Sequence, residues 1–361
     1  MKRFRPGPRA VTLALLLSVT NAAALRAQQT GPVLKSGAVE VSINGRVQTQ
    51  LNTTSVEDEP ASEVILRRVR LEALVKVNDV VSGKIQPDFA GDRVSLKDAY
   101  LRVTLDPALQ LVAGKAHRPF STITITSSTR ILPVERGVRI RGVDNDWDEF
   151  NLVADLGYAD RDVGLQLQGQ PRGAPLGLSY AAGYFNGPAR DEAGSESSYQ
   201  LAARIGVQPA KDLRVAAAWS SRHFGYESDV VPGETFLRRG NAWQADVEIG
   251  SHAPGFHAVG EVAMGDFDPL TDRRFVGAQA WLAFRTDTVS AKISAVEPLF
   301  RVSHGSVDAE GADLELGGTL LTPGVNVYLG GLNRVMFNWD FWRPADGETQ
   351  NSFKAQFQLA F

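Results

Sequence analysis

The chain alternates apolar and polar residues at a period of two, and this feature constrains its fold more than any other. It is clearest in the stretch 351–361, which reads N-S-F-K-A-Q-F-Q-L-A-F. One face of that stretch would carry Phe353, Ala355, Phe357, Leu359 and Phe361. The other face would carry Ser352, Lys354, Gln356, Gln358 and Ala360. Because successive side chains of a strand point to opposite faces, the stretch predicts a β-strand with one apolar and one wet face.

The same alternation recurs along the chain, and no segment is a convincing amphipathic helix. The segments that show it clearly are 39–51, 65–77, 81–89, 94–105, 199–208, 213–222, 242–249 and 334–341. Weaker segments are 161–170, 176–186, 256–266, 275–285, 289–296, 312–320 and 325–330. Some connections are tight, as at 78–79 and 209–212, whereas others are long and polar: 52–62, 187–197, 225–240 and 344–350. Short turns at one end and long loops at the other are typical of outer-membrane barrels.

Two kinds of all-β protein fit such strands, a soluble sandwich and a closed membrane barrel. The 334 residues that follow residue 27 are many more than the roughly 100 residues of one sandwich domain. In a membrane barrel, lipid outside and water inside require alternation along every strand. We therefore predict one domain over residues 39–361, an antiparallel transmembrane β-barrel of about 16 strands.

The first 27 residues have the pattern of a secretory signal peptide. A basic start, M-K-R-F-R-P-G-P-R, precedes the apolar run A-V-T-L-A-L-L-L-S-V, and small residues follow at 22–24 and at Ala27. The apolar run is too short for a membrane-spanning helix. We expect cleavage after Ala27, with cleavage after Ala24 as the alternative. Residues 28–38 would then form a short segment ahead of the barrel.

Charge and cysteine content exclude several classes of protein. The first 27 residues hold five basic and no acidic residues, so the remainder has 33 Lys and Arg against 41 Asp and Glu, a formal charge of −8. Nucleic-acid-binding proteins have a basic surplus, and we predict no nucleic-acid partner. Without Cys the chain has no disulfides and no thiolate ligands. Its His residues lack metal-ligand spacing, and we predict neither a metal nor a cofactor.

Two basic residues do not fit the alternation. Arg67 and Lys97 fall on the predicted lipid face of their strands. A charged side chain on that face is costly unless it extends to the membrane interface. Each residue could also mark a β-bulge, which inserts one residue and exchanges the two faces of the strand, or could face a neighbouring subunit.

Three motifs between residues 67 and 120 have counterparts in one protein family. They read R-R-V-R-L-E-A-L-V-K-V, K-I-Q-P-D-F-A-G-D-R-V-S-L-K-D-A-Y-L and L-V-A-G-K-A-H-R-P-F-S. With L-T-P-G-V-N-V-Y-L, R-V-M-F-N-W and F-K-A-Q-F-Q-L-A-F near the C-terminus, they resemble the phosphate-selective porins (porin O and P type) of Gram-negative outer membranes. The resemblance covers about residues 39–140 and 315–361. A last strand that closes on Phe, here Phe361, is also similar to the ends of other outer-membrane proteins.

This resemblance implies a homotrimer of 16-stranded barrels, in each of which the third loop folds into the pore. It also implies a ladder of arginines that leads anions to a constriction. The residues after Lys115-Ala116-His117-Arg118-Pro119-Phe120-Ser121 match the inward loop, but they depart from the family pattern because 121–128 contains no lysine. The departure argues against a phosphate site that relies on a loop lysine. The expected partners are small anions, outer-membrane lipid, and the barrel assembly machinery, which would recognise the strand ending in Phe361.

Arginines concentrate in the segment 117–141. The segment holds one acid, Glu135, and has a formal charge of +4 from Arg118, Arg130, Arg136, Arg139 and Arg141. A guanidinium binds phosphate or carboxylate through a planar fork and stays charged, so we predict that these arginines line an anion path. The alternatives are an internal salt-bridge lattice with acids such as Asp88 and Asp98, or a loop that stays outside the pore. Strand parity predicts further lumen-facing residues: Arg46, Arg68, Arg70, Asp98, Tyr100 and Arg102.

Two other motifs have simpler interpretations. His304 and Ser306 have the spacing of the catalytic pair of outer-membrane phospholipases, but their flanks alternate poorly, and we predict a loop. The run 144–149 resembles the start of a calcium loop without its later Gly and acid, and we predict a solvated acidic turn. We therefore predict an outer-membrane porin, not an enzyme, through which small anions such as phosphate or polyphosphate diffuse passively. A general-diffusion porin without anion preference and a barrel enzyme are the alternatives.

Overall fold

The computed structural model describes residues 32–56, 59–143, 146–192, 197–228, 234–250, 253–308 and 316–361. The predicted signal peptide, 1–27, lies outside these residues, as do Asp144 and Asn145 of the acidic run. None of the helices in the described ranges is long and apolar enough to cross a membrane.

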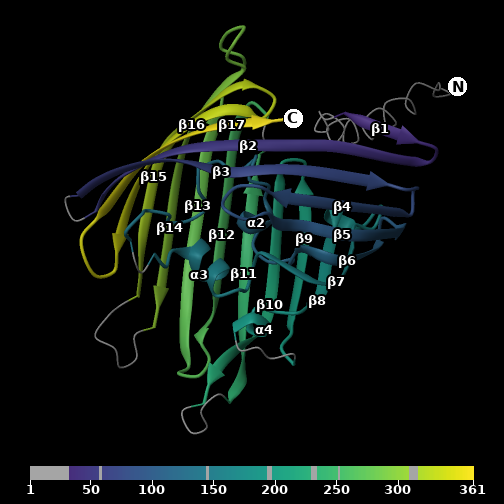
Figure 1. The fold of residues 1–361 in the computed structure, drawn as a ribbon, viewed down its shortest axis with the longest axis horizontal. Helices are drawn as coiled ribbons and strands as arrows, with labels where there is room; N and C mark the ends of the chain where they lie inside the picture. The colour runs from purple at the N-terminus through teal and green to yellow at the C-terminus, as the bar shows by residue number, and fades with distance from the viewer. Residues whose placement is uncertain are drawn as a thin grey trace, which may run out of the picture.

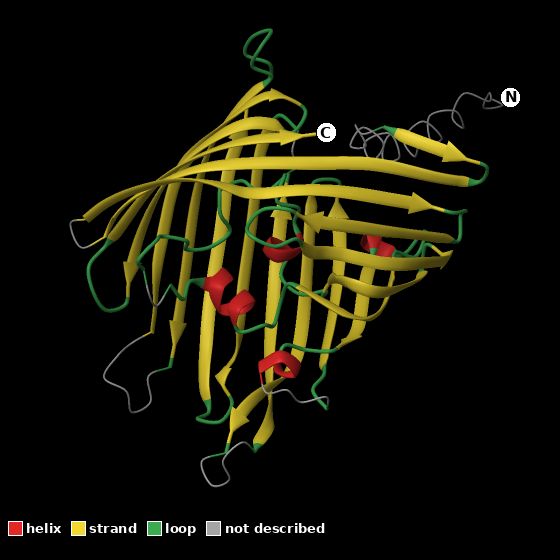
Figure 2. Cartoon of the chain, viewed as in Figure 1, coloured by secondary structure: helices red, strands yellow, loops and turns green. Residues whose placement is uncertain are grey.

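Sixteen strands in the described residues close into one antiparallel barrel (Figure 1, Figure 2). From β2 onward each strand pairs with the next in the chain, and β17 pairs back with β2. The strands are β2 Val39–Val56, β3 Glu59–Lys76, β4 Val81–Asp88, β5 Ser95–Asp106, β6 Leu109–His117, β7 Arg161–Gly169, β8 Ser179–Phe185, β9 Gln200–Ala210, β10 Leu213–Glu227, β11 Thr235–Ile249, β12 Gly255–Asp268, β13 Arg273–Arg285, β14 Ala295–Val307, β15 Leu316–Gly330, β16 Asn333–Pro344 and β17 Gln350–Ala360. The predicted fold class is confirmed.

The C-terminal strand has the two faces that its sequence predicts. Phe357 and Leu359 are 60% and 54% exposed on the outer wall, whereas Gln356 and Gln358 are buried in the lumen. The chain then ends against β2, where the backbone N–H and C=O of Phe361 exchange hydrogen bonds with those of Gly45, at 3.1 and 2.9 Å. The Phe361 ring occupies the space that a Cβ on residue 45 would need, so Gly45 lets the last residue close the barrel.

Several sequence-based boundaries were wrong. Residues 52–62 are not a long loop, because β2 continues to Val56 and β3 begins at Glu59. Residues 316–320 and 325–330 belong to one strand, β15, whereas 312–315 lie outside the described residues. The segment 289–296 is mostly a turn ahead of β14. The strand β6 was not predicted, and a short strand, β1 (Val33–Ser36), pairs with β2 within the segment 28–38. Where strands extend beyond the lipid both faces can be polar, so the alternation signal disappears there.

Arg67 and Lys97 each occupy a β-bulge. Opposite β2 the register moves from Arg68 to Leu66, and opposite β4 it moves from Asp98 to Leu96, so one residue is skipped each time. A bulge inserts one residue and thereby exchanges the two faces of its strand. Leu66 and Leu96 are accordingly exposed on the outer wall, whereas Arg67 and Lys97 line the lumen. Of the three interpretations left open by the sequence, the bulge is the correct one.

The bulge at Lys97 makes a prediction about chemical labelling. Cysteine in place of Lys97 should react quickly with a small charged thiol reagent, because the side chain lines a water-filled chamber. Cysteine in place of Leu96, one residue away and outward, should stay unreactive in a lipid bilayer. The chain has no native Cys, so labelling can be followed by the mass of the intact protein. Equal reactivity at the two positions would contradict the register.

The connection between β6 and β7, residues 118–160, folds into the barrel and is referred to as loop 3. It carries two short helices, α2 (Thr122–Ile125) and α3 (Glu149–Asp155), which lie inside the ring of strands (Figure 1, Figure 2). Two more short helices, η1 (Pro175–Gly177) and α4 (Ala189–Glu192), lie in later connections.

The apolar residues of loop 3 form the barrel's internal core with one side of the wall. In the first group the loop residues Phe120, Leu152 and Tyr158 pack against small residues and Phe275 of β10–β13. In the second group Ile123, Ile131 and Leu132 pack against β12–β14, including Trp281. Burying these side chains on β10–β14 leaves the polar face of loop 3 toward the opposite wall, β2–β5. The open space of the lumen therefore lies between loop 3 and β2–β5.

Candidate functional site

Loop 3 divides the lumen into two chambers. The turn-side chamber, about 1010 Å³, reaches the β15–β16 turn and the chain end at Phe361. The loop-side chamber, about 480 Å³, is lined by residues near the opposite end of β2 and β3, such as Asn52 and Glu63. The two chambers share four lining residues, which we call the eyelet: Arg67, Arg68, Arg136 and Phe150. These four side chains lie where the two chambers adjoin.

One buried carboxylate, Glu135, holds the eyelet together. Arg67 Nε and Nη2 donate to its two oxygens at 2.5 and 3.0 Å, and Arg68 Nη2 lies 3.6 Å from Oε2. Burial alone would raise the pKa of Glu135, but the two guanidinium groups outweigh it and hold the pKa well below its usual range. Glu135 therefore stays ionised and fastens loop 3 to β3. Gln48 of β2 supports the arrangement by accepting from Arg68 Nη1 at 2.9 Å.

Arg136 is the eyelet cation that comes from loop 3 itself. Its Nε donates to the Ile123 carbonyl at 2.9 Å and its Nη2 to the Thr126 carbonyl at 2.6 Å. Within the described residues it makes no ion pair. Burial is the main cause that lowers the pKa of Arg136 to about 10, so it remains charged at neutral pH. With three arginines and one glutamate around it, the eyelet has a surplus of two positive charges.

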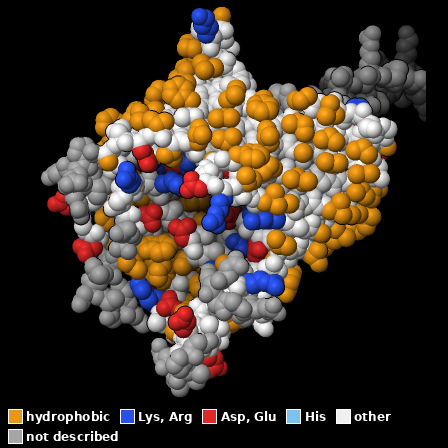
Figure 3. Space-filling model, in the orientation of Figure 1, with side chains coloured by type: hydrophobic (Ala, Val, Ile, Leu, Met, Phe, Trp, Pro, Cys, Tyr) orange, Lys and Arg blue, Asp and Glu red, His pale blue; other side chains and the backbone are white. Residues whose placement is uncertain are grey.

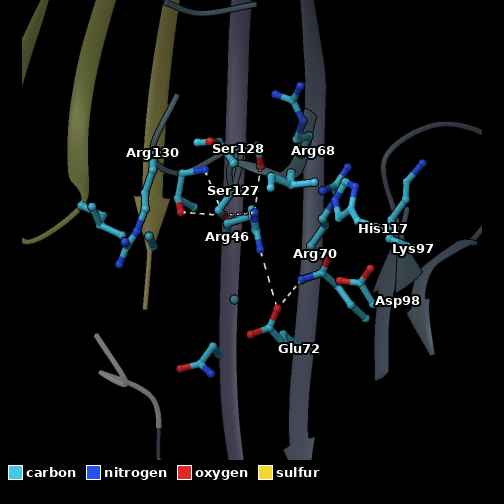
Figure 4. Close-up of a pocket in the computed structure, with 18 of the residues that line it drawn as sticks. Arg46, Arg68, Arg70, Glu72, Lys97, Asp98, His117, Ser127, Ser128 and Arg130 are labelled. Atoms are coloured by element: carbon cyan, nitrogen blue, oxygen red, sulfur yellow. Dashed lines mark hydrogen bonds and ion pairs between the residues drawn. The ribbon is translucent and has the colours of Figure 1, made fainter. Parts of the chain in front are cut away.

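The turn-side chamber is strongly basic, with ten Lys and Arg against four Asp and Glu in its lining. Some of these bases are paired: Asp98 accepts from Arg161 Nε at 2.6 Å and from Lys84 Nζ at 2.9 Å. Arg46 instead points toward the hydroxyls of Ser127 and Ser128 on loop 3, at 3.1 and 2.8 Å, with Glu72 3.9 Å away (Figure 4).

Besides Arg136, two further cations of this chamber, Lys97 and Arg130, make no ion pair among the residues that the structure describes. They line it from the β5 bulge and from loop 3 respectively (Figure 4). Burial lowers the pKa of Arg130 below its ordinary value, but a guanidinium remains charged at neutral pH. Both positive charges are therefore available to a dissolved anion.

The loop-side chamber is closer to balance, with five Arg against four Asp and Glu. Arg139 and Arg141 of loop 3 face Glu63, Asp146 and Asp155 across it. On the outside of the molecule, apolar and charged side chains occupy different regions. Figure 3 shows hydrophobic side chains over the wall at β2–β6, and charged side chains gathered around the hollow at the centre. Inside the lumen, the surplus of Lys and Arg over Asp and Glu is small in the loop-side chamber and large in the turn-side chamber.

The comparison with family models decides the classification. Residues 41–229, slightly more than half of the chain, match the model of the phosphate-selective porins O and P. The chain belongs to the phosphate-selective porin O and P family. It is accordingly a channel of the Gram-negative outer membrane, and the resemblance seen in the sequence is confirmed. None of the curated proteins matches it significantly.

Solved porin structures share the fold at low sequence identity. An anion-selective porin from Comamonas acidovorans is 12% identical, with 90% of this chain and 100% of that chain covered and a TM-score of 0.63. OmpT, an outer membrane protein of Vibrio cholerae, is 15% identical, with 92% and 100% covered and a TM-score of 0.60. OprB of Pseudomonas putida is 9% identical, with 89% and 94% covered and a TM-score of 0.63. At such identities the likeness establishes the fold alone.

Most of the residues predicted to line the pore of this porin do line a chamber. Arg46, Arg70, Asp98 and Arg130 line the turn-side chamber, Arg68 and Arg136 line both chambers, and Arg139 and Arg141 line the loop-side chamber. Tyr100 and Arg102 contact each other, Nη2 to Oη at 3.4 Å, and line neither chamber.

Arg118 also lies outside both chambers, at the base of loop 3. Its Nη1 donates to Gln200 at 2.7 Å and lies 3.4 Å from Asp162, and its Nη2 donates to the Ala159 carbonyl. These bonds fasten the loop to β7 and β9.

Five cations of the turn-side chamber are not among the site residues predicted from the sequence: Arg67, Lys84, Lys97, Arg161 and Arg214. The available signal for Arg67 and Lys97 was their poor fit to the outer face, which marked the two bulges. Arg161 begins β7 directly after loop 3, and nothing local distinguishes it. Its role follows from its pairing with Asp98, 63 positions earlier.

Two minor sequence predictions were wrong. His304 and Ser306 do not lie in a loop but in β14, where both side chains face outward. His304 Nδ1 lies 2.9 Å from Thr319 Oγ1 of β15, and within the described residues it contacts no carboxylate. Asp148 and Glu149 are not solvated but fully buried. Asp148 caps α3 by accepting from the Asn151 backbone N–H at 3.0 Å, because a helix start needs such an acceptor.

Proposed function

We propose that this porin passes small anions, such as phosphate or polyphosphate, in preference to cations. The observation that supports the proposal is the eyelet, where three arginines outnumber one glutamate at the junction of the chambers. Charges beyond a Debye length of about 8 Å count little at physiological ionic strength. The formal charge of −8 outside the signal segment is therefore a poor guide to ion choice, and the local surplus is the better one.

The distribution of cations also suits permeation as opposed to tight binding. An anion that leaves the eyelet on the turn side enters a chamber lined by Arg46, Lys97 and Arg130, and none of these three is closely paired to a carboxylate in the described residues. A series of shallow attractive positions favours conduction, because a single deep site would hold the ion. The segment 121–128 of loop 3 has no lysine, and the lysine Lys97 lines the chamber from the wall, because the β5 bulge turns it to the lumen.

Ion selectivity measured in planar bilayers tests the proposal. In a potassium chloride gradient the reversal potential should report chloride over potassium, and millimolar phosphate should reduce the chloride current. Changing Arg136 and Arg139 together to Gln should lower the permeability ratio by about fourfold or more per charge. A unit charge about 5 Å from the path contributes roughly 0.8 kcal/mol even at the dielectric constant of water.

Two controls separate charge from loop structure in this experiment. Arg136→Lys keeps the charge and should keep the selectivity, although it alters the bonds to Ile123 and Thr126. Arg102→Gln removes an inward charge that lines neither chamber and should change little. Selection of potassium by the wild type, or chloride current indifferent to phosphate while sugars pass freely, would indicate a general-diffusion porin.

The proposal extends to processing and assembly. Its supports are the signal-like residues 1–27, the closure of β17 on β2 at Phe361, and a trimeric form among the similar structures, that of Vibrio cholerae OmpT. We infer a mature chain that begins at Gln28 and is inserted by the barrel assembly machinery. It would form a homotrimer and act without catalysis. Intact mass and the size of the complex in detergent test these points.

A further inference from the structure

A cluster of basic and aromatic side chains lies on the outer wall, at the loop end of β9–β11. Its members are Tyr199, His223 and Arg239, which we call the rim cluster. His223 and Arg239 are opposite each other across β10 and β11. Arg239 shares its face of β11 with Trp243, which is 60% exposed on the outer wall. The cluster therefore faces away from the lumen and has no part in permeation.

The charge of Arg239 has no carboxylate partner in the described part of the chain. Its Nη1 donates to Ser221 Oγ at 2.9 Å, and its guanidinium carbon lies 4.6 Å from the centre of the Tyr199 ring. The outward carboxylate of the next strand, Asp266, accepts from the Asn241 backbone N–H at 2.8 Å and lies 3.8 Å from Arg274. The contacts of Arg239 are thus with neutral groups, which orient the guanidinium without neutralising it.

Two hydrogen-bond donors of the rim cluster, one on His223 and one on Arg239, face each other. The backbone N–H of Tyr199 donates to His223 Nδ1 at 3.2 Å, so a neutral His223 carries its proton on Nε2. That Nε2–H faces Arg239 Nη2 at 3.4 Å, and neither atom offers an acceptor to the other. Two N–H donors held side by side, one of them charged, are satisfied when an anionic oxygen accepts from both.

The position of the cluster relates it to the membrane boundary. Trp219 and Trp243 pair on the outer wall with ring centroids 6.2 Å apart, and exposed Trp residues of barrels mark the interface between hydrocarbon and water. Arg239 lies four residues farther toward the loops, about 13 Å along the strand. Because the longer loops of outer-membrane barrels are extracellular, this is the headgroup level of the outer leaflet.

We propose that Tyr199, His223 and Arg239 bind the phosphate of a lipid headgroup in the outer leaflet. A phosphate oxygen accepts from Arg239 Nη2 and His223 Nε2, and the Tyr199 ring keeps the guanidinium in place. Tyr199 is itself stacked on Tyr184, with ring centroids 5.5 Å apart and planes at 16°. The acyl chains of the same lipid lie along the apolar wall below, beside Trp219 and Trp243.

Lipid retention by the full-length protein in detergent tests the proposal. Native mass spectrometry would count bound molecules during titration with diphosphoryl lipid A, a phosphate-bearing lipid with acyl chains. Arg239→Gln should weaken retention by about tenfold or more, the usual effect of losing a hydrogen bond to a charged group. Arg274→Gln is the matched control, because it removes an outward arginine of the same rim that already has a carboxylate neighbour, Asp266. It should change retention by less than about twofold.

Two further arms identify the ligand. Lipid A stripped of phosphate should bind wild type and Arg239→Gln alike, because the lost contact is to phosphate. Excess inorganic phosphate should not displace diphosphoryl lipid A, because free phosphate lacks the chains that pack on the wall. Equal losses in Arg239→Gln and Arg274→Gln would reduce the effect to general rim charge and overturn the site. Unchanged retention in Arg239→Gln, or displacement by inorganic phosphate, would overturn it as well.

Discussion

Replacing Glu135 with Gln is expected to release loop 3 from the barrel wall and to make the open channel flicker. Glu135 is the only carboxylate that pairs with Arg67 and Arg68 in the described residues, and its side chain is 4% exposed. Removing one partner of a buried ion pair costs about 3–5 kcal/mol, because the remaining charge stays buried without compensation. The barrel itself is closed by sixteen strands, so the cost should be expressed in the loop.

Single-channel recording measures the effect of this substitution directly. Glu135→Gln should convert a quiet open level into rapid partial closures, while far-ultraviolet circular dichroism stays that of a folded barrel. Glu63→Gln is the matched control: it removes one carboxylate from the loop-side chamber, where Glu63 accepts only from Asn52 among the described residues, at 3.0 Å. This control should raise anion selectivity slightly without adding noise. A quiet Glu135→Gln channel, or equal noise in both variants, would contradict the fastening role of Glu135.

The barrel could be predicted from the sequence because lipid imposes one rule on every strand that it touches. In β17, Phe357 and Leu359 face lipid and Gln356 faces the lumen, as alternation requires. The rule fails where a strand leaves the lipid. At the loop end of β14, His304 and Ser306 face outward and the buried face includes Ser303, so both faces are polar and the segment looked like a loop.

The bulges were visible in the sequence only as misfits. Arg67 and Lys97 each interrupt an apolar face, and alternation alone cannot distinguish a bulge from a charged side chain that reaches the interface. The decision depends on the register of the neighbouring strand, which is a tertiary property. Once placed, both residues line the lumen with the arginines that parity had already assigned there.

The composition of the eyelet could not be predicted, because its contacts join distant parts of the chain. Arg67 and Glu135 are 68 positions apart, and Arg301 donates to the Glu135 carbonyl at 2.7 Å from 166 positions away. The concentration of arginines in 117–141 located the loop correctly. It could not separate Arg118, whose bonds anchor the loop base, from Arg136, which faces both chambers. Tertiary packing decides which of these arginines have a carboxylate partner.

Raising the pH is expected to loosen loop 3 from the strands on which it packs, β10–β14, through a second carboxyl contact. Glu149 at the start of α3 and Glu261 of β12 are 0% and 2% exposed, and one oxygen of each carboxyl group has no hydrogen-bond partner in the described residues. Two neighbouring buried carboxyl groups are tolerated when one of them is protonated, because like charges at close range are not both ionised. Gln279 of β13 donates to Glu149 at 3.2 Å, and the Ile123 backbone N–H donates to Glu261 at 3.1 Å. No Lys or Arg pairs with either carboxyl in the described residues.

The sign of the pH effect follows from the direction in which burial moves the carboxyl pKa values of the loop. Burial and then the neighbouring Glu261 raise the pKa of Glu149 well above its ordinary value. Burial also raises the pKa of Asp148, the α3 cap, to about 6. A raised pKa means that the docked loop binds more protons than the released loop, so docking is strongest below the ordinary carboxyl pKa. Docking weakens as the pH rises through the raised pKa values, by about 1.4 kcal/mol for each tenfold difference in proton affinity between the docked and released loop.

Other charges around the pair do not reverse this sign. Asp246 of β11 adds further negative charge but is ion-paired with Arg204 at 2.7 Å. Arg301 of β14 acts on Asp148 from a distance and is itself paired with Asp340 at 2.9 Å. Ionisation of the pair Glu149 and Glu261 therefore remains the change that separates loop 3 from β12.

Open-channel noise recorded from about pH 4 to about pH 9 should show this weakening and identify its source, because the range spans the ordinary and the raised carboxyl pKa values. The wild type should be quiet at the acid end and increasingly noisy toward the alkaline end. Glu149→Gln should be much quieter than the wild type at the alkaline end, because its amide can donate to Glu261 at every pH as the protonated acid does, and only the contribution of Asp148 remains. Glu261→Gln should behave the same way, since the uncharged pair is restored from the other side. Glu63→Gln, which alters a carboxylate outside this contact, should keep the pH dependence of the wild type. If Glu149→Gln retained the wild-type dependence, the loop would be responding to other groups, and the shared proton between α3 and β12 would have no role in holding it.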